Sequence, residues 1–352
     1  MPKENLLGYT RPQLESMFAE MGEKPFRGRQ LYKWIYQVRQ NDFAAMTDLS
    51  RPLRDRLAER FVIEPLQLDH RARSEDGTEK FLFRLADNHP VETVLIPDTE
   101  RERATVCISS QAGCALACRF CATGTMGLIR DLTVGEIVGQ LLYLRHLYGN
   151  DCFSNVVFMG MGEPLNNYQN VVDSLQIMLD ELGLGLGAKR ITVSTSGVTP
   201  KIRKLADTGL KVRLALSLHA ATQEKRVRIM PIAETFGLEK LIESVRYYAN
   251  QTRDRVTFEY VLIDGFNDTM DDVLALSRLI EGIPCKINVL AYNPVPGLPF
   301  ERPTDDKVDW FGRQLYPRAP AVTVRKSRGR DIDAACGQLA ARKNGRGVVY
   351  ES

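Results

Sequence analysis

Residues 107–124 read Cys107-Ile-Ser-Ser-Gln-Ala-Gly-Cys114-Ala-Leu-Ala-Cys118-Arg-Phe-Cys121-Ala-Thr-Gly124, and this stretch decides the fold. Its last three cysteines are separated by three and then by two residues, so they lie on one loop. Three thiolates on one loop can hold three corners of a four-iron cubane and leave the fourth iron open. Zinc fits less well, because a structural zinc site closes with four ligands and no second Cys/His pair follows at the expected distance. Unless the three thiols are unrelated and buried, the spacing predicts an iron–sulfur site.

The composition is that of an ordinary globular protein. The 352 residues are 44% hydrophobic and 26% charged, which is enough to bury a large core. The sequence has 47 basic and 44 acidic side chains, a formal net charge of only +3. A nucleic-acid surface must therefore come from local clustering of charge. The first residues, Met1-Pro-Lys-Glu-Asn5, lack a basic segment followed by an apolar stretch, and no run approaches the roughly 18 apolar residues of a membrane helix, so we expect a cytoplasmic protein without a membrane partner. Seven cysteines, an odd number, favour a metal site in a reducing compartment over a disulfide framework.

Alternation of β-rich runs with helix-length segments continues along the chain beyond the cysteine loop. A helix is expected over 133–148, where Thr133 and Glu136 form a capping box. Six such units are two fewer than in a full eightfold barrel, so the fold class is predicted to be α/β, a partial (βα)6 barrel with an open side. Because chemistry gathers at the carboxyl ends of such strands, the residues that follow each strand become candidates. The predicted strands are 105–109, 155–159, 190–195, 212–217, 256–263 and 286–291.

Four regions are expected on this basis. Residues 11–61 have helical spacing only, so residues 1–62 are expected to form a small helical accessory domain. Residues 63–99 are expected to form a β-hairpin linker, residues 100–300 the barrel, and residues 301–352 a C-terminal extension with the Cys336 loop. The accessory domain mixes basic and aromatic side chains, which suits RNA phosphates and bases, although a solvated helix face is an equally open interpretation. These side chains are Lys24, Phe26, Arg27, Arg29, Tyr32, Lys33, Trp34, Tyr36 and Arg39.

Cys-x3-Cys-x2-Cys is also the signature of radical S-adenosylmethionine (SAM) enzymes, in which the open iron binds the amino and carboxyl groups of SAM. Further segments over nearly the whole chain resemble the RlmN family within that superfamily. The resemblance implies a radical SAM barrel and a [4Fe–4S] cluster held by Cys114, Cys118 and Cys121. The segments that carry it are Phe158-Met-Gly-Met-Gly-Glu163-Pro164, Ser194-Thr-Ser-Gly197, Ser217-Leu-His219, Asn293-Pro294 and Asp331-Ile-Asp-Ala-Ala-Cys336-Gly-Gln-Leu339.

A SAM pocket is implied by the same resemblance. Gly162 lets the backbone approach a ligand, and the Glu163 carboxylate can accept hydrogen bonds from a cationic amine. A simple strand-to-helix turn is the alternative for this pair, and strand-end Ser or His residues are often structural. By resemblance the pocket is completed by Ser194, Ser217, Leu218, His219 and Asn293.

The chemistry implied by the resemblance attaches a methyl group to carbon 2 of adenine. That carbon is electron-poor, so a carbon radical is required. The resemblance implies that Cys336 takes a methyl group from one SAM molecule. A 5′-deoxyadenosyl radical from a second SAM molecule then removes a hydrogen atom from that methyl group. The methylene radical adds to the adenine, and Cys107 then closes a transient disulfide that frees the methylated base. Glu92 matches the family position of the base that removes the ring proton, with Glu100 and Glu102 as alternatives.

The implied substrates are 23S ribosomal RNA, at its peptidyl-transferase centre, and tRNA, next to the anticodon. An electron donor such as flavodoxin or ferredoxin is a further expected partner, and the protein is expected to be a monomer. The basic cluster at 325–330 precedes Cys336 and suits phosphates, although charge runs also solvate surfaces. Cys152 and Cys285 match no functional position and are expected in the core.

Three other classes remain open to test. Cfr-type enzymes methylate carbon 8 of adenine and share the cysteine cluster and the Ala-Cys-Gly-Gln-Leu context, whereas the segments 26–36 and 284–290 look more like RlmN. A plain iron–sulfur electron carrier would need neither the Gly162-Glu163 turn nor a barrel. A non-enzymatic RNA-binding module would keep all its function in residues 1–61.

Overall fold

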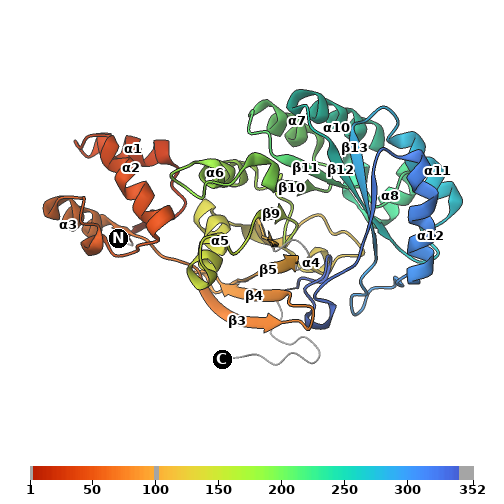
Figure 1. Ribbon diagram of the computed structural model, residues 1–352, viewed down its shortest axis with the longest axis horizontal. Helices are drawn as coiled ribbons and strands as arrows, with labels where there is room; N and C mark the ends of the chain where they lie inside the picture. Colours follow the sequence, from red (N-terminus) through yellow and green to blue (C-terminus); the bar gives the residue numbers. More distant parts are fainter. Residues whose placement is uncertain (1–2, 99–102, 341–352) are drawn as a thin grey trace.

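A mixed sheet of ten strands frames the computed structural model, which describes residues 3–98 and 103–340 (Figure 1). Its strand order is β14-β13-β12-β11-β10-β9-β6-β5-β4-β3, and neighbouring strands from β14 through β9 to β6 in this order pair in parallel. The six strands predicted for the barrel are confirmed. They are β6 (Arg103–Cys107), β9 (Asn155–Phe158), β10 (Ile191–Thr195), β11 (Arg213–Ser217), β12 (Val256–Leu262) and β13 (Cys285–Ala291).

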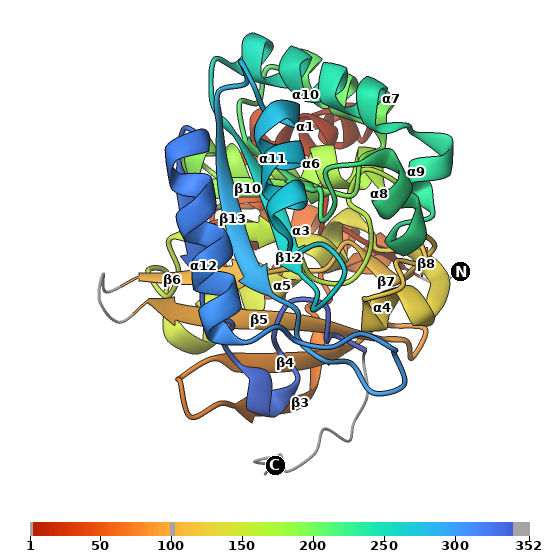
Figure 2. The same ribbon diagram turned by 90° about the vertical axis from the view of Figure 1, so that its right-hand side faces the viewer.

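Helices connect successive parallel strands and cover one face of the curved sheet (Figure 2). The expected capping box is present at the start of α5, where the Thr133 hydroxyl accepts from the Glu136 amide. The edge strands β14 and β3 do not pair with each other among the described residues, so the barrel is open, as predicted. The helices are α5 (Val134–Tyr148), α6 (Tyr168–Leu179), α7 (Thr199–Asp207), α8 (Gln223–Ile229), α9 (Ile232–Thr235), α10 (Leu238–Thr252), α11 (Met270–Leu279) and α12 (Asp305–Leu315).

The region expected to be a hairpin linker is a three-stranded antiparallel extension of the same sheet. β3 (Gln67–Arg73), β4 (Glu79–Arg84) and β5 (Pro90–Asp98) continue it, because β5 pairs with β6. The turn at 74–78 joins β3 to β4. β3 escaped prediction because it is a polar edge strand whose sequence lacks apolar alternation.

A second strand absent from the prediction, β14 (Val322–Arg325), lies at the other edge of the sheet and pairs in parallel with β13. It has only four residues, which alternate between half-buried and exposed. A short edge strand of this kind gives a weak sequence pattern.

The N-terminal region is helical apart from one short strand pair. Its helices are α1 (Arg11–Glu20), α2 (Phe26–Lys33) and α3 (Arg51–Arg60), with a π-helical turn at Trp34–Val38. The expectation of helices only was incomplete, because β1 (Glu4–Asn5) pairs in parallel with β2 (Phe61–Val62). Every helix in the described part of the chain is too short or too polar to cross a lipid bilayer.

Two glycines bring the N-terminal region against helix α5. Gly8 has a φ of 105°, and a Cβ atom on it would lie 2.3 Å from the Gly135 nitrogen. A Cβ atom on Gly135 would in turn lie 2.3 Å from the Leu7 carbonyl oxygen. The Tyr36 hydroxyl accepts from the Gly8 amide at 2.9 Å and donates to the Tyr9 carbonyl oxygen at 2.9 Å. The two regions therefore meet backbone to backbone, which only glycine allows.

We predict that Gly135→Ala lowers the free energy of unfolding by about 2 kcal/mol, because the added methyl group overpacks this contact. Urea denaturation followed by circular dichroism measures the change. Gly187→Ala is the matched control, because nothing lies within 4 Å of its added Cβ atom and its φ is −70°. Equal stabilities of the two variants would contradict the backbone contact.

Candidate active site

One cavity collects the carboxyl ends of the parallel strands and the cysteine loop. It receives residues that follow β9, β10, β11 and β13, as expected for a βα barrel. The predicted residues that line it are Cys114, Cys118, Cys121, Gly162, Glu163, Ser194, Ser217, His219, Asn293 and Cys336. We call this space the active-site cavity.

The cysteine loop is shaped by short local elements. β7 (Gln111–Cys114) enters it, the short helix α4 (Ala122–Thr125) leaves it, and β8 (Gly127–Asp131) pairs back onto β7. The Cys121 amide donates to the Cys118 carbonyl oxygen at 3.1 Å, which closes a turn between two of the cysteines. All three thiols are thereby held in one tight segment at the cavity wall.

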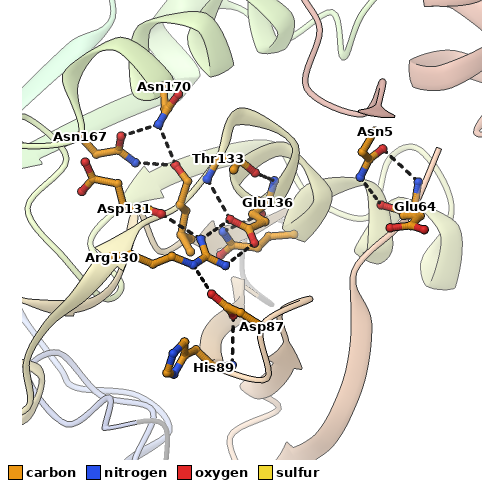
Figure 3. A network of polar contacts seen from close by, with 12 residues as sticks. Asn5, Glu64, Asp87, His89, Arg130, Asp131, Thr133, Glu136, Asn167 and Asn170 are labelled. Atoms are coloured by element: carbon orange, nitrogen blue, oxygen red, sulfur yellow. Dashed lines mark hydrogen bonds and ion pairs between the residues drawn. The ribbon is translucent and has the colours of Figure 1, made fainter. Parts of the chain in front are cut away.

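A polar network fastens the chain where it leaves this loop (Figure 3). The Arg130 guanidinium binds both carboxylate oxygens of Glu136, at 2.8 and 2.7 Å, and also contacts Asp87. The hydrogen bond from Arg130 holds the pKa of the Asp87 carboxyl below its usual value. Asn167 Nδ2 donates to the Leu132 carbonyl oxygen at 2.7 Å. The loop thus has a rigid exit, tied to α5, to the β4–β5 turn and to the segment before α6.

Burial raises the pKa of all three loop thiols, that of Cys114 to about 12. Ligation of iron therefore requires that each thiol lose its proton. Among the described residues, no three His, Cys, Asp or Glu side chains converge closely enough to share a single metal ion. A cubane does not need such convergence, because each cysteine binds a different iron.

A buried arginine lies next to the cysteine loop. Arg226 has no exposed surface, and its guanidinium donates to the carbonyl oxygens of Ser196, Ser217 and Leu218. Burial lowers its pKa to about 10, while the nearby Cys118 favours the charged form. Its Nη1 has no hydrogen-bond partner among the described residues. A buried cation without a carboxylate suits a neighbouring anionic group, so the donor set fits a thiolate-bound iron–sulfur cluster.

The Gly-rich turn after β9 places a carboxylate at the cavity wall. The buried Glu163 accepts from the Ser196 amide at 2.7 Å and from the Leu165 amide at 3.1 Å. Burial raises its pKa, and these two hydrogen bonds oppose the rise. Gly162 has a φ of 99°, and a Cβ atom on it would lie 2.5 Å from that of Gln111. The glycine is therefore needed for packing as well as for any ligand.

Hydroxyl and imidazole groups line the next two strand ends. The Ser194 and Ser217 hydroxyl oxygens lie 3.4 Å apart. His219 Nδ1 accepts from the Val261 amide at 3.1 Å, so in the neutral ring Nε2 carries the hydrogen. Burial, helped by the nearby guanidinium, lowers the pKa of His219 to about 3. His219 is therefore a neutral donor at the cavity wall.

Two hydrogen bonds join the C-terminal loop to the cysteine loop. The Ala122 amide donates to the Gly337 carbonyl oxygen at 2.8 Å, and the Thr123 hydroxyl donates to the Leu339 carbonyl oxygen at 2.6 Å. Both acceptors follow Cys336 closely in sequence, so the bonds fix its position relative to the cysteine loop.

The other side of the C-terminal loop rests on the turn between β3 and β4. The Ser74 hydroxyl donates to Asp331 Oδ1 at 2.6 Å, and the Gly329 amide donates to Asp76 Oδ2 at 2.9 Å. The antiparallel extension is therefore a support for this loop.

The two cysteines with implied roles lie near each other as free thiols. Cys336 faces the cavity, and its carbonyl oxygen accepts from Asn293 Nδ2 at 3.2 Å. Cys336 is exposed to the open space of the cavity, but the protein around that space raises the pKa of its thiol by desolvation, with Arg325 opposing and Glu259 reinforcing the rise. Cys107, the last residue of β6, is buried, and both burial and the charge of Cys336 raise its pKa.

Three of the predicted site residues do not line the cavity: Cys107, Leu218 and Glu92. Leu218 is fully buried, so only its backbone can serve a ligand. The Glu92 carboxylate lies 3.2 Å from Lys80 Nζ and accepts from the Ala340 amide at 3.0 Å. Glu92 therefore contacts the C-terminal loop rather than the open space.

Sequence reasoning missed Glu259 and Arg226. Glu259 lines the cavity, accepts from Asn288 Nδ2 at 2.7 Å, and lies 3.9 Å from Arg325 Nη1. The available signal was a charged residue within β12, an otherwise apolar strand. Arg226 gave no signal, because basic residues on short helices are usually exposed.

Comparison with known proteins agrees with this geometry. The family model "Radical SAM superfamily" matches residues 108–277, and the fold and the site together define a radical SAM enzyme. The model "Ribosomal RNA large subunit methyltransferase N-terminal domain" matches residues 4–63. The dual-specificity RNA methyltransferase RlmN of Rhodospirillum rubrum is 46% identical over 344 residues, which are 95% of this chain and 80% of that protein. The chain belongs to the RlmN family of radical SAM RNA methyltransferases.

A solved structure extends the likeness to three dimensions. The crystal structure of a radical SAM methyltransferase from Sphaerobacter thermophilus is 43% identical, with a TM-score of 0.90. The alignment covers 96% of this chain and 100% of that one. The family uses a [4Fe–4S] cluster and SAM, which are the cofactors predicted from the cysteine loop.

We predict that Cys118→Ala loses the cluster, because two thiolates on this loop are too few to retain a cubane. After anaerobic reconstitution, iron and sulfide analysis and visible absorbance measure the content. Cys152→Ala is the control, because Cys152 is a half-buried thiol that lies outside the cavity lining. A full cluster in Cys118→Ala would refute the ligand assignment.

A pH-dependent contribution to stability is predicted for His219. Its pKa in the fold, about 3, lies below the ordinary value of 6.5, so the unfolded chain binds the proton first. The stabilisation is complete above pH ~6.5 and is lost as the pH falls towards ~3. For the metal-free protein, this group alone should remove about 1.4 kcal/mol of unfolding free energy between pH ~7.5 and ~5.5.

The test compares this pH dependence in wild type and His219→Asn. Asn tolerates the φ of 56° at this position, and its oxygen can accept from the Val261 amide. Urea titrations at both pH values should show a smaller loss of stability in the variant. Equal losses would mean that His219 is not held neutral.

Proposed function

We propose that the protein methylates carbon 2 of specific adenosines, one in the peptidyl-transferase centre of 23S ribosomal RNA and one next to the anticodon of tRNA. The observation that supports this most is the position of Cys336, which lines the same cavity as the three cluster cysteines. A thiol placed there can carry a carbon atom between SAM and a base. The RNA methyltransferase name of the R. rubrum relative supports RNA substrates. A cytoplasmic, monomeric enzyme is also part of the proposal.

Binding and orientation fall to the residues that line the cavity. Cys114, Cys118 and Cys121 would hold the cluster, which would supply the electron for reductive cleavage of SAM to a 5′-deoxyadenosyl radical. Glu163 offers a carboxylate to a cationic amine, and His219 offers its Nε2 hydrogen to an acceptor. Ser194, Ser217, Asn293 and the backbone at 162 and 218 complete the proposed SAM pocket.

Methyl transfer to Cys336 requires its thiolate. Desolvation by the cavity walls works against this ionisation, and the Arg325 guanidinium works in its favour. The sulfur then attacks the SAM methyl group, a sulfur–carbon bond forms, and S-adenosylhomocysteine leaves. Removal of one hydrogen atom by the 5′-deoxyadenosyl radical makes the carbon reactive towards the adenine.

Release of the product is assigned to Cys107. After the adduct has lost one electron and the ring proton, the Cys107 thiolate attacks the sulfur of Cys336. A disulfide forms, the sulfur–carbon bond breaks, and the electron pair left on the methylene carbon takes a proton to give the methyl group. The buried setting of Cys107 keeps it protonated, and so unreactive, before this step.

Removal of the ring proton from adenine is assigned to the Glu92 carboxylate. Glu92 lies on β5, and its carboxylate is within hydrogen-bonding distance of Lys80 Nζ and of the Ala340 amide in the C-terminal loop. The alternatives, Glu100 and Glu102, lie outside the described residues.

RNA binding is proposed at two basic surfaces. Arg325, Lys326 and Arg330 are exposed just before the Cys336 segment. In the N-terminal region, Lys24, Arg29 and Lys33 are exposed together with Phe26, whereas the expected stacking residues Tyr32 and Tyr36 are buried in the core. Phosphate contacts are therefore the main proposed contribution of that region.

Carbon 8 of adenine, the Cfr-type target, is the alternative position. The RlmN-like segments 26–36 and 284–290 and the 46% identity to RlmN favour carbon 2. RNA treated with the reconstituted enzyme should yield 2-methyladenosine when its nucleosides are compared with authentic standards by mass spectrometry. A yield of 8-methyladenosine alone would overturn the proposal.

The two cysteines should give opposite phenotypes. We predict that Cys336→Ala forms no methylcysteine and never becomes attached to RNA, because no carbon can be carried. Cys107→Ala should be methylated and should add to adenine, but it lacks the thiolate that cleaves the bridge, so a covalent protein–RNA adduct should accumulate at Cys336. A denaturing gel with labelled RNA, followed by nuclease digestion and peptide mass spectrometry, measures both.

Cys285→Ala is the control for loss of a buried thiol, and it should neither trap RNA nor stop methylation. An inactive Cys107→Ala without an adduct, or a Cys336→Ala that still methylates RNA, would show that these roles are misassigned.

A further inference from the structure

A second cavity, of about 510 Å³, lies on the other side of the cysteine loop. It is bounded by this loop, by the end of α8 and by the segments that follow β12 and β13. Cys118 and Gly124 line both this cavity and the active-site cavity, so the cysteine loop is the wall between them. Cys336 lines only the active-site cavity. We call the second space the outer cavity.

The outer cavity has a cationic rim and an apolar floor. Arg119 and Arg228 are exposed, and no carboxylate is among the side chains that line it. Neither guanidinium has an ion-pair partner in the described part of the chain, and that of Arg228 lies 5.0 Å from the Phe266 ring centre. Phe266, Leu298 and Phe300 form the floor. The active-site cavity differs in kind, because two buried carboxylates line it.

We propose that the outer cavity is the docking surface for a small acidic redox protein that delivers one electron to the cluster. The inference rests on the proposed function, which needs that electron for every cleavage of SAM. The donor is oxidised by one electron, the cluster is reduced by one, and no atom is transferred. Electron transfer weakens steeply with distance, and Cys118 is the cluster ligand that an occupant of this cavity would reach directly.

Charge complementarity favours an acidic protein as the occupant. A positive rim around an apolar centre is a common design of transient protein interfaces and steers an acidic partner into place. RNA would also be attracted by two arginines, but its target base must reach Cys336, which lies beyond the cysteine loop. The separation also lets donor and RNA bind at the same time.

Charge reversal at the rim tests the proposal in the reconstituted holoenzyme. Arg119→Glu/Arg228→Glu should lower the second-order rate constant for cluster reduction by reduced flavodoxin at least about tenfold at low ionic strength. The difference should shrink as salt is added. Stopped-flow absorbance measures the rate, and a fluorescence titration of flavodoxin measures binding without turnover. Reduction and SAM cleavage with dithionite should not change, because dithionite needs no docking surface.

A matched control carries the same change of charge elsewhere. Arg253 and Arg255 are exposed, line a different cavity and lie just before β12, whereas the outer cavity lies beyond its far end. Arg253→Glu/Arg255→Glu should reduce normally. Phe266→Ser, which changes no charge, should weaken flavodoxin binding about fivefold or more while keeping its salt dependence.

The outcomes separate the possible errors. Normal reduction by flavodoxin in both the charge-reversed and the Phe266→Ser proteins would overturn the docking site. A fall in RNA affinity with normal reduction would make the outer cavity an RNA surface and would equally overturn it. If the wild-type protein fails to cleave SAM even with dithionite, the proposed function fails before the docking site is addressed.

Discussion

The two hydrogen bonds between the cysteine loop and the C-terminal loop are the contact on which the rest of the active site depends. They join Ala122 to Gly337 and Thr123 to Leu339, and Cys336 lies immediately beside them. In the proposed mechanism the carbon is carried by the thiol of Cys336, which lies far in sequence from the cysteines that would hold the cluster. The loop contact adds that thiol, and it replaces an encounter between distant segments with a fixed geometry.

The antiparallel strands β3, β4 and β5 support the C-terminal loop that makes this contact. A loop held only by the cysteine loop would be free on its other side, and the β3–β4 turn supplies the missing support through Ser74 and Asp76. Glu92 on β5 accepts from the same loop at Ala340. The sheet extension thus supports the side of the C-terminal loop that faces away from the cysteine loop. This role requires the extension to continue the barrel sheet rather than to link two domains.

Much of the fold and part of the site could be predicted from sequence, because their signals are local. The six parallel strands have dense apolar runs, and the spacing of Cys114, Cys118 and Cys121 is fixed within one loop. β3 and β14 could not be predicted, because edge strands lack a buried face that would impose a pattern. The arrangement of Glu92 and the buried Arg226 depends on segments far apart in the chain, about which local pattern says nothing.

Charge explains how the core of the site can hold both thiols and a cation. Burial raises the pKa of the three loop thiols, so the metal-free fold favours their neutral forms. Arg226 is buried in the same region, and among residues 3–98 and 103–340 its guanidinium binds backbone oxygens but no carboxylate. An unpaired buried cation is destabilising, and thiolates bound to iron supply the missing negative charge. Cluster binding therefore stabilises the strand ends that Arg226 joins, so the cofactor and the pocket that surrounds it are built together.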